Sequence, residues 1–139
     1  MLAGMPDVDG NHLSNYTDAP PNTSSYYNAI NWAVSQNILT GINPTTLALS
    51  QTLTREQAVT FLYRTSNKLN CSFSDTSGPN ADTFPDFNSV STFARIAMKW
   101  ATKRYIVTGN QGYLYPQGLL TRAEAAQLIY KLSIKASRN

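Results

Sequence analysis

Apolar side chains recur along this chain with the period of an α-helix, and they do so in two corresponding pairs of segments. In the opening segment, Tyr27, Ile30 and Val34 fall on one helical face, with Trp32 and Ala33 beside them. A later segment repeats this face with Phe93, Ala97, Trp100, Ala101 and Arg104. The pattern therefore predicts a first helix in each of two units, ending before Gly41 and Gly109, where we expect left-handed C-caps.

A second helix in each unit begins with a capping box. Thr54 and Thr121 each stand three residues before a residue that can bond back to the N-cap amide, Gln57 and Glu124 respectively. The apolar positions that follow have helical spacing and are expected to face the core. They are Ala58, Phe61 and Leu62 in the first unit and Ala125, Leu128, Ile129 and Leu132 in the second.

The two units are copies of one sequence. The segments Tyr16-Thr17-Asp18, Trp32-Ala33 and Ile38-Leu39-Thr40-Gly41 recur at one constant spacing as Phe84-Pro85-Asp86, Trp100-Ala101 and Ile106-Val107-Thr108-Gly109. After a one-residue deletion, Leu53-Thr54-Arg55 recurs as Leu120-Thr121-Arg122. The organisation predicted is a polar leader (1–15), a first repeat (16–69), a surface linker (70–83), a second repeat (84–133) and a tail (134–139).

Both second helices carry an arginine in their first turn, Arg55 and Arg122, where a cation opposes the helix dipole. An anion is therefore expected near each guanidinium. Asp18 and Asp86 are the internal candidates, and an external anion bound by the helix amides and the guanidinium is the alternative.

Charge is sparse and unevenly distributed. Charged residues make up 14% of the 139 residues, and the net charge is +3. Up to Asp86 there are three basic and seven acidic residues, whereas from Phe87 onward there are eight basic and one acidic. This balance argues against nucleic acid as the partner, because phosphate binding requires more Lys and Arg. We expect the stripe of Arg95, Lys99 and Lys103 to be a solvated helix face.

Several site chemistries are excluded by the residues available. Cys71 and His12 are the only cysteine and histidine, so a disulfide, a structural zinc site and a Ser-His-Asp or Cys-His nucleophile are not expected. No cofactor is implied. No apolar run is long enough to span a bilayer, so membrane insertion is not expected, and residues 1–15 do not have the pattern of a signal peptide.

The set of motifs, in this order and within about 50 residues, resembles the S-layer homology repeat. The resemblance implies an all-α fold, a small helical bundle built from two helix-loop-helix repeats. It also implies a non-catalytic, extracellular module that binds an anionic, often pyruvylated, secondary cell-wall polysaccharide in grooves between repeats. By motif, Arg55 and Arg122 would pair with the ligand carboxylate, and Trp32 and Trp100 would line the groove. Asp18, Asp86, Gly41 and Gly109 would shape the groove or bond the hydroxyls and the acetamide of the ligand. Glu124 is a further ligand-binding candidate, and Gln57 at its place in the first copy makes the first groove the weaker match.

The family commonly uses three consecutive repeats, and this chain has two. Met5-Pro6-Asp7-Val8 could be the vestige of another opening motif. We therefore expect either self-association or docking on the rest of a larger protein. The start at Met1 and the polar end at Ser137-Arg138-Asn139 suggest a fragment of a longer exported chain.

Two other functions remain open. The first is a protein-interaction or assembly module that keeps the repeat fold without binding glycan, which the missing third repeat favours. The second is glycoside hydrolysis by paired carboxylates such as Asp86 and Glu124, although each has a structural role available to it.

Overall fold

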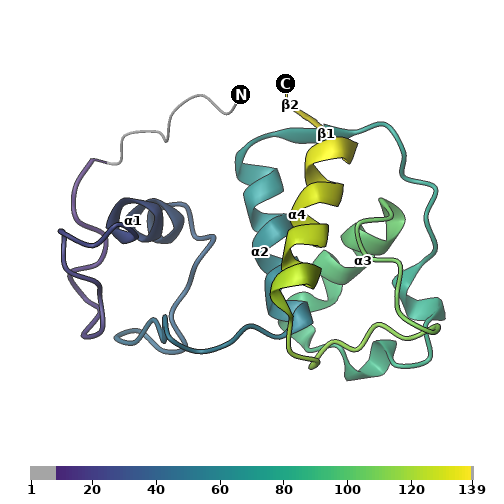
Figure 1. The fold of residues 1–139 in the computed structure, drawn as a ribbon, viewed down its shortest axis with the longest axis horizontal. Coiled ribbons are helices and arrows are strands. Elements are labelled where there is room, and N and C mark those ends of the chain that lie inside the picture. Colours follow the sequence, from purple (N-terminus) through teal and green to yellow (C-terminus); the bar gives the residue numbers. More distant parts are fainter. Residues whose placement is uncertain (1–8, 139) are drawn as a thin grey trace. The chain divides into compact units, whose positions relative to one another are not determined.

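The computed structural model describes residues 9–138, and these fall into two compact units that meet between Gln51 and Thr52. Each unit has helical structure of its own (Figure 1). The opening motif sought at Met5-Pro6-Asp7-Val8 lies outside the described residues. The unit boundary falls within the first repeat of the sequence, so the two helices of that repeat belong to different units.

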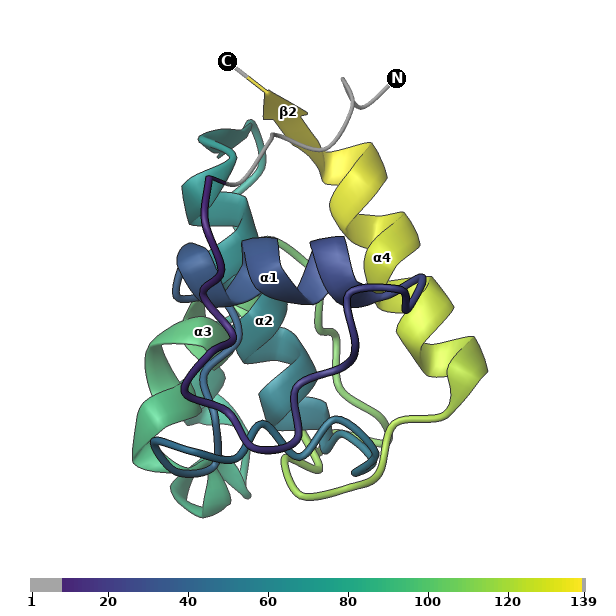
Figure 2. The same cartoon turned by 90° about the vertical axis from the view of Figure 1, so that its left-hand side faces the viewer.

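Unit 1, residues 9–51, contains one helix, α1 (Tyr27–Ser35), framed by the loops before and after it (Figure 2). Its apolar core is small and consists of Leu13, Ile38 and Leu47, each at most 5% exposed. The buried Asn31 side chain ties α1 to the leader. It accepts a hydrogen bond from the His12 amide at 2.9 Å and donates one to the Gly10 carbonyl at 3.1 Å. The second half of the leader is therefore part of this unit.

Unit 2, residues 52–138 as described, is built on three helices: α2 (Arg55–Lys68), α3 (Arg95–Lys103) and α4 (Arg122–Lys135). Helix α2 packs against both α3 and α4 (Figures 1 and 2). Three short 3₁₀ turns, η1 (Ala81–Thr83), η2 (Phe87–Ser89) and η3 (Thr92–Ala94), lead into α3. The core residues come from α2, α3 and the segments flanking α3. They include Val59, Val90, Ala97, Met98, Trp100, Ala101, Ile106 and Leu114.

The expectation of an all-α fold is wrong. Strand β1 (Cys71–Phe73) pairs antiparallel with β2 (Ala136–Arg138), with Ser72 opposite Ser137. The fold is therefore small and mixed, mainly helical with a two-stranded sheet. Each strand is three residues long, and the two lie far apart in sequence, so no local periodicity announces them. They form because α2 and α4 bring the chain segments that follow them side by side.

The segment expected to be a surface linker is also more ordered than its polar composition indicates. It contains β1 and η1, and Ala81 is fully buried. Gly78 donates its amide hydrogen to the Lys103 carbonyl, and a Cβ at this position would lie 2.0 Å from the Thr102 carbonyl oxygen. Glycine is thus required because the backbone lies directly against the end of α3.

The starts of α2 and α4 are as the sequence predicts, and the ends of α1 and α3 are not. Both capping boxes are present, Thr54 with Gln57 and Thr121 with Glu124. The left-handed residues after α1 and α3, however, are Asn37 (φ 56°) and Tyr105 (φ 55°), so the C-cap role assigned to Gly41 and Gly109 is wrong. Gly109 has positive φ for another reason, because it begins the turn that is closed between Asn110 and Tyr113.

Candidate functional site

Arg55 is held at the start of α2 by a loop of the second repeat. Its amide donates to the Gly118 carbonyl at 2.8 Å, and its Nη1 donates to the Tyr115 carbonyl at 3.1 Å. The guanidinium Nη2 forms an ion pair with the Glu124 carboxylate of α4. The backbone and the charged end of Arg55 are therefore both fixed by contacts within unit 2.

Glu124 is the anion that was expected near the Arg55 guanidinium. Its Oε2 accepts from Arg55, while its Oε1 faces the Thr121 amide in the capping box. The hydrogen bond from Arg55, followed by that from Thr121, lowers the pKa of Glu124 below its ordinary value. Asp86, one of the two internal candidates named from the sequence, forms no ion pair with Arg55 or Arg122 among the described residues.

Asp86 instead organises the loop beside the site. Its two carboxylate oxygens accept from the amides of Leu114 and Tyr115, at 2.9 and 2.8 Å. In unit 1, Asp18 does the same with Leu47 and Ala48, at 2.8 and 2.7 Å, and these two amides lower its pKa. Both aspartates are therefore acceptors for loop amides, and within residues 9–138 neither is recorded with an arginine partner.

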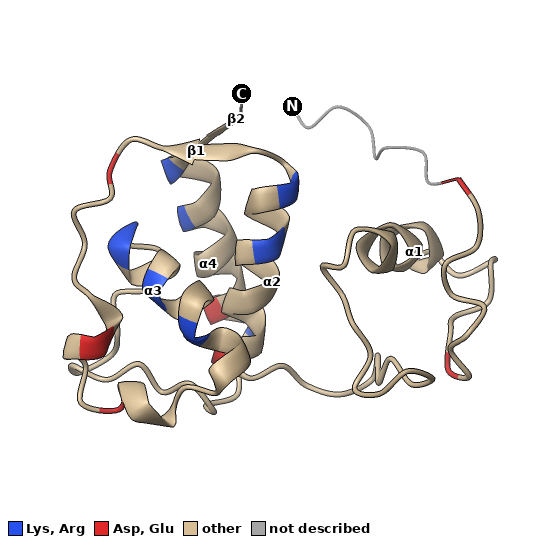
Figure 3. Cartoon of the chain, turned by 180° about the vertical axis from the view of Figure 1, so that it is seen from behind, with Lys and Arg blue, Asp and Glu red and all other residues tan. Residues whose placement is uncertain are grey.

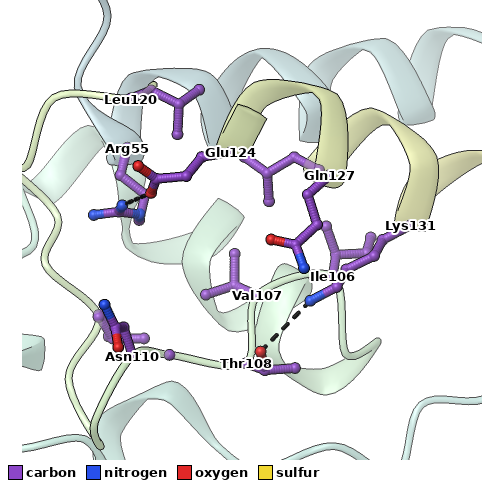
Figure 4. Close-up of a pocket in the computed structure, with 12 residues that line it drawn as sticks. Arg55, Ile106, Val107, Thr108, Asn110, Leu120, Glu124, Gln127 and Lys131 are labelled. Carbon is purple, nitrogen blue, oxygen red and sulfur yellow. Dashed lines mark hydrogen bonds and ion pairs between the residues drawn. The ribbon is translucent and has the colours of Figure 1, made fainter. Parts of the chain in front are cut away.

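A pocket with a volume of about 300 Å³ lies between the start of α2, the turn after α3 and one face of α4 (Figure 4). Its floor is apolar, and its rim holds two cations, a carboxylate, amides and a hydroxyl. Lys131 reaches across from α4 to within 3.5 Å of Thr108 Oγ1. The lining residues are Arg55, Ile106, Val107, Thr108, Gly109, Asn110, Leu114, Leu120, Glu124, Gln127, Leu128 and Lys131.

Gly109 has no room for a side chain. Its φ is +78°, and an added Cβ would lie 2.8 Å from the Phe84 ring and 3.1 Å from the Tyr113 carbonyl oxygen. Phe84 is the aromatic residue of the repeat's opening motif. The close approach therefore explains why the aromatic residue and the glycine appear together in the repeat.

Three of the nine predicted site residues line this pocket: Arg55, Gly109 and Glu124. Asp86 acts through the loop. The Arg122 side chain is exposed and makes no hydrogen bond or ion pair with any residue that the structure describes. Asp18, Trp32 and Gly41 belong to unit 1. Arg55 of the first repeat thus lies beside the turn of the second repeat. Arg122, the arginine of the second repeat itself, does not line this pocket.

Trp100 does not line the pocket. Its side chain is 9% exposed, and its ring meets the rings of Tyr63 and Phe73 edge-on, with centroid distances of 5.6 Å to each. The Arg104 guanidinium lies 5.7 Å from the Trp100 ring centroid. Trp100 borders a separate cavity of about 470 Å³ between α2 and α3. Its main contribution is to the core.

Sequence reasoning missed the two polar residues that α4 contributes beyond Glu124, namely Gln127 and Lys131. They stand three and seven residues after Glu124, which places all three on one helical face. That spacing is visible in the sequence. Which side of the pocket the face lines depends on how α4 packs against α2.

A family model for the S-layer homology domain matches residues 15–59 and 83–126, which is more than half of the chain. The chain belongs to the S-layer homology domain family. The match also confirms the two repeats predicted from the sequence. No curated protein matches this chain. S-layer homology domains anchor proteins to cell-wall polysaccharides, and membership implies association with the cell surface or the S-layer.

Two further findings concern other kinds of site. Within residues 9–138, no group of three or more His, Cys, Asp or Glu side chains could hold a metal ion. Among the helices described, none is both long enough and apolar enough to cross a membrane. The S-layer homology family is a binding and anchoring family that is not typically catalytic.

Proposed function

We propose that the pocket between α2 and α4 binds an acidic sugar of a secondary cell-wall polysaccharide, and that the chain thereby acts as a non-catalytic anchor. The observation that carries this proposal is the placing of two cations, Arg55 and Lys131, at opposite ends of one small pocket (Figure 4). Charge-assisted hydrogen bonds from cations are among the stronger polar contacts available to a carboxylate.

The floor of the pocket supports a sugar as the ligand. Ile106, Val107 and Leu114 are each at most 5% exposed and form an apolar base. Thr108 and Gln127 place a hydroxyl and an amide above it. A sugar ring has apolar C–H faces and polar hydroxyl edges, so it matches a site of this kind, and a pyruvylated amino sugar would add the carboxylate and the acetamide.

Within this pocket we assign the two cations different roles. The Arg55 guanidinium is already paired with Glu124, so it orients the rim and offers its remaining N–H groups to ligand oxygens. Among the described residues, the Lys131 ammonium has the Thr108 hydroxyl as its partner, at the long distance of 3.5 Å. Lys131 is therefore the cation that is most available to a ligand carboxylate.

The test compares Lys131→Gln with Lys99→Gln in binding to purified cell-wall sacculi. Lys99 is an exposed lysine on α3 that does not line this pocket, which makes it a matched control for net charge. Loss of one charge-assisted contact should weaken retention by Lys131→Gln about tenfold. Lys99→Gln should bind as the unmodified chain does.

Two probes separate the ligand from the wall itself. Sacculi stripped of their secondary polysaccharide should retain neither variant nor the unmodified chain. The second probe is polysaccharide whose carboxyl groups have been reduced to alcohols. The unmodified chain should bind it about as weakly as Lys131→Gln binds the intact polysaccharide. Equal retention of Lys131→Gln and Lys99→Gln would show that this pocket is not the binding site.

A further inference from the structure

We propose that the cavity between α2, β1 and α3 is a second anion site, and that it binds a phosphomonoester with an apolar organic group. Every residue that lines this cavity belongs to unit 2, and none of them lines the pocket beside α4. The proposal therefore concerns a separate site and does not depend on glycan binding. It rests on cations without an anionic partner and on a buried N–H group without an acceptor, both among the described residues.

One side of the cavity is aromatic. Tyr63 of α2, Phe73 of β1 and Trp100 of α3 all line it, and the Trp100 ring meets the other two rings edge-on. The volume of about 470 Å³ lies within the range of small-molecule sites. A ligand of that size has room for an organic group, and an apolar group would lie against the aromatic rings.

The other side of the cavity is basic and has no carboxylate beside it. Lys99, Lys103 and Arg104 lie in the second half of α3 or directly after it, and Figure 3 shows basic residues on this helix. None of the described residues that line the cavity is acidic, and within residues 9–138 none of the three cations forms an ion pair. The dipole at this end of a helix favours cations, but it leaves most of their charge uncompensated.

Arg104 has a hydrogen-bond donor that no described residue satisfies. Its Nη1 donates to the Trp100 carbonyl at 3.1 Å, and its guanidinium lies over the Phe73 ring, 5.1 Å from the centroid. Its Nε is buried and has no hydrogen-bond partner among the described residues. Nε and Nη2 form one edge of the guanidinium. An oxyanion that accepts from this edge would satisfy Nε in a bidentate contact and remove the cost of an unpaired donor.

Lys103 supplies the second cation of the site. It is half-buried, and its ammonium makes no hydrogen bond or ion pair with any residue that the structure describes. Lys99 is engaged differently, because its ammonium lies 5.4 Å from the centroid of the Phe87 ring. We therefore assign contacts with the ligand to Lys103 and Arg104, and none to Lys99.

The charge of the site favours a phosphate group over a carboxylate. A phosphomonoester carries a charge of about −1.5 to −2 near pH 7, which balances two cations, whereas a carboxylate balances one. Its three terminal oxygens can accept from the Arg104 edge and from the Lys103 ammonium at the same time. Burial lowers the pKa of Arg104, which indicates that the guanidinium is partly desolvated, and charges attract more strongly where water is excluded.

The experiment titrates the isotopically labelled full chain with phenyl phosphate and follows its NMR spectrum. Binding should shift the resonance of the Arg104 Nε–H group, because this group gains an acceptor. Lys103→Gln and Arg104→Lys should each weaken binding about tenfold, the first through loss of a charge and the second through loss of the bidentate edge at unchanged charge. Lys103→Arg should restore most of the affinity.

Control variants and control ligands isolate the contacts. Lys68→Gln removes the same charge from an exposed position of α2 that does not line the cavity, and it should bind phenyl phosphate as the unmodified chain does. Benzoate, which has the ring and a carboxylate, should bind about tenfold more weakly. Inorganic phosphate, which leaves the aromatic side uncovered, should bind several-fold more weakly. Circular dichroism should show that every variant keeps its helices.

Three results would overturn the proposal. The first is an Arg104 Nε–H resonance that does not move during the titration with phenyl phosphate. The second is equal affinity of Lys103→Gln, Arg104→Lys and Lys68→Gln for this ligand. The third is benzoate or inorganic phosphate that binds as tightly as phenyl phosphate does.

Retention on sacculi separates two sources of the phosphate group. A free ligand would leave the retention of Lys103→Gln equal to that of the unmodified chain, whereas a phosphate group borne by the wall would lower it. Neither outcome changes the comparison of Lys131→Gln with Lys99→Gln, which tests the pocket beside α4. The two proposals can therefore fail separately.

Discussion

The first helices of the two repeats, α1 and α3, have nearly the same sequence pattern and very different surroundings. Helix α3 packs on α2, and its tryptophan, Trp100, is 9% exposed and meets two other aromatic rings. Helix α1 lies in a unit with a small apolar core, and Trp32 is half-buried. The comparison teaches that the structural unit of this protein is not the sequence repeat. The apolar face of α3 is buried where the second helix of the preceding repeat, α2, packs against it.

The largest effect is expected when each of the two tryptophans is replaced by alanine in turn. Trp100→Ala should lower the free energy of unfolding of unit 2 by about 3–5 kcal/mol, because it opens a cavity in a close-packed core. Trp32→Ala should cost about 1 kcal/mol in unit 1, because part of that side chain is already in water. Urea denaturation followed by circular dichroism measures both. Equal losses would contradict the difference in packing between the two helices.

A second test concerns the Glu56 side chain of α2, for which α4 has Ala123 at the corresponding position. The Glu56 carboxylate, 4% exposed, accepts from the Ser91 amide at 2.8 Å and from its hydroxyl at 2.6 Å. Glu56→Ala should destabilise unit 2 by about 1.5–3 kcal/mol, because it removes a charged acceptor and leaves both donors unpaired.

The matched control for Glu56→Ala is Ala123→Glu at the corresponding, exposed position of α4. It should change the unfolding free energy by less than about 0.5 kcal/mol at low protein concentration. Thermal denaturation of both variants makes the comparison. A destabilisation of similar size in the two variants would mean that α4 already has a partner for this face in the single molecule.

The smallest effect expected is a change in the response to acid. The folded-state pKa of Glu124 is lowered, chiefly by Arg55, so its stabilising contribution is complete above its ordinary value near 4.5 and is lost as the pH falls through the lowered value. Glu124→Gln should therefore flatten the decline in melting temperature between about pH 5 and pH 3. Gln57→Glu, in the capping box of the first repeat, should alter this decline less. An unchanged decline in Glu124→Gln would show that the ion pair does not contribute to stability.

Local features were predictable because they depend on neighbours in the chain. The repeats, the starts of α2 and α4 and both capping boxes follow from residue types at fixed short spacings, such as Thr54 with Gln57. The helix ends were less predictable. Asn37 and Tyr105 adopt the left-handed conformation there, although glycine favours it most. The amides that follow them, those of Ile38 and Ile106, donate back to the Ala33 and Ala101 carbonyls at 2.9 Å each.

The composition of the site was only partly predictable. Arg55, Gly109 and Glu124 were expected from the motifs, and all three line the pocket. Lys131 and Gln127 were not expected, and Trp100, which was expected to line a groove, lies largely in the core and borders the separate cavity between α2 and α3. Motifs identify which residues a repeat uses, but whether a side chain faces a pocket or a core depends on the helix packed against it.

The sequence by itself determined the repeats, the capped helix starts, the family and the division of charge between the two ends, because each is encoded in residue identities and their spacing. Only the tertiary structure decided that the first repeat is divided between two units, that β1 pairs with β2, and that Arg55 lies beside the turn of the following repeat. The physical reason is burial. Each amphipathic helix needs a second apolar face to cover it, and a repeated sequence does not specify which copy supplies that face.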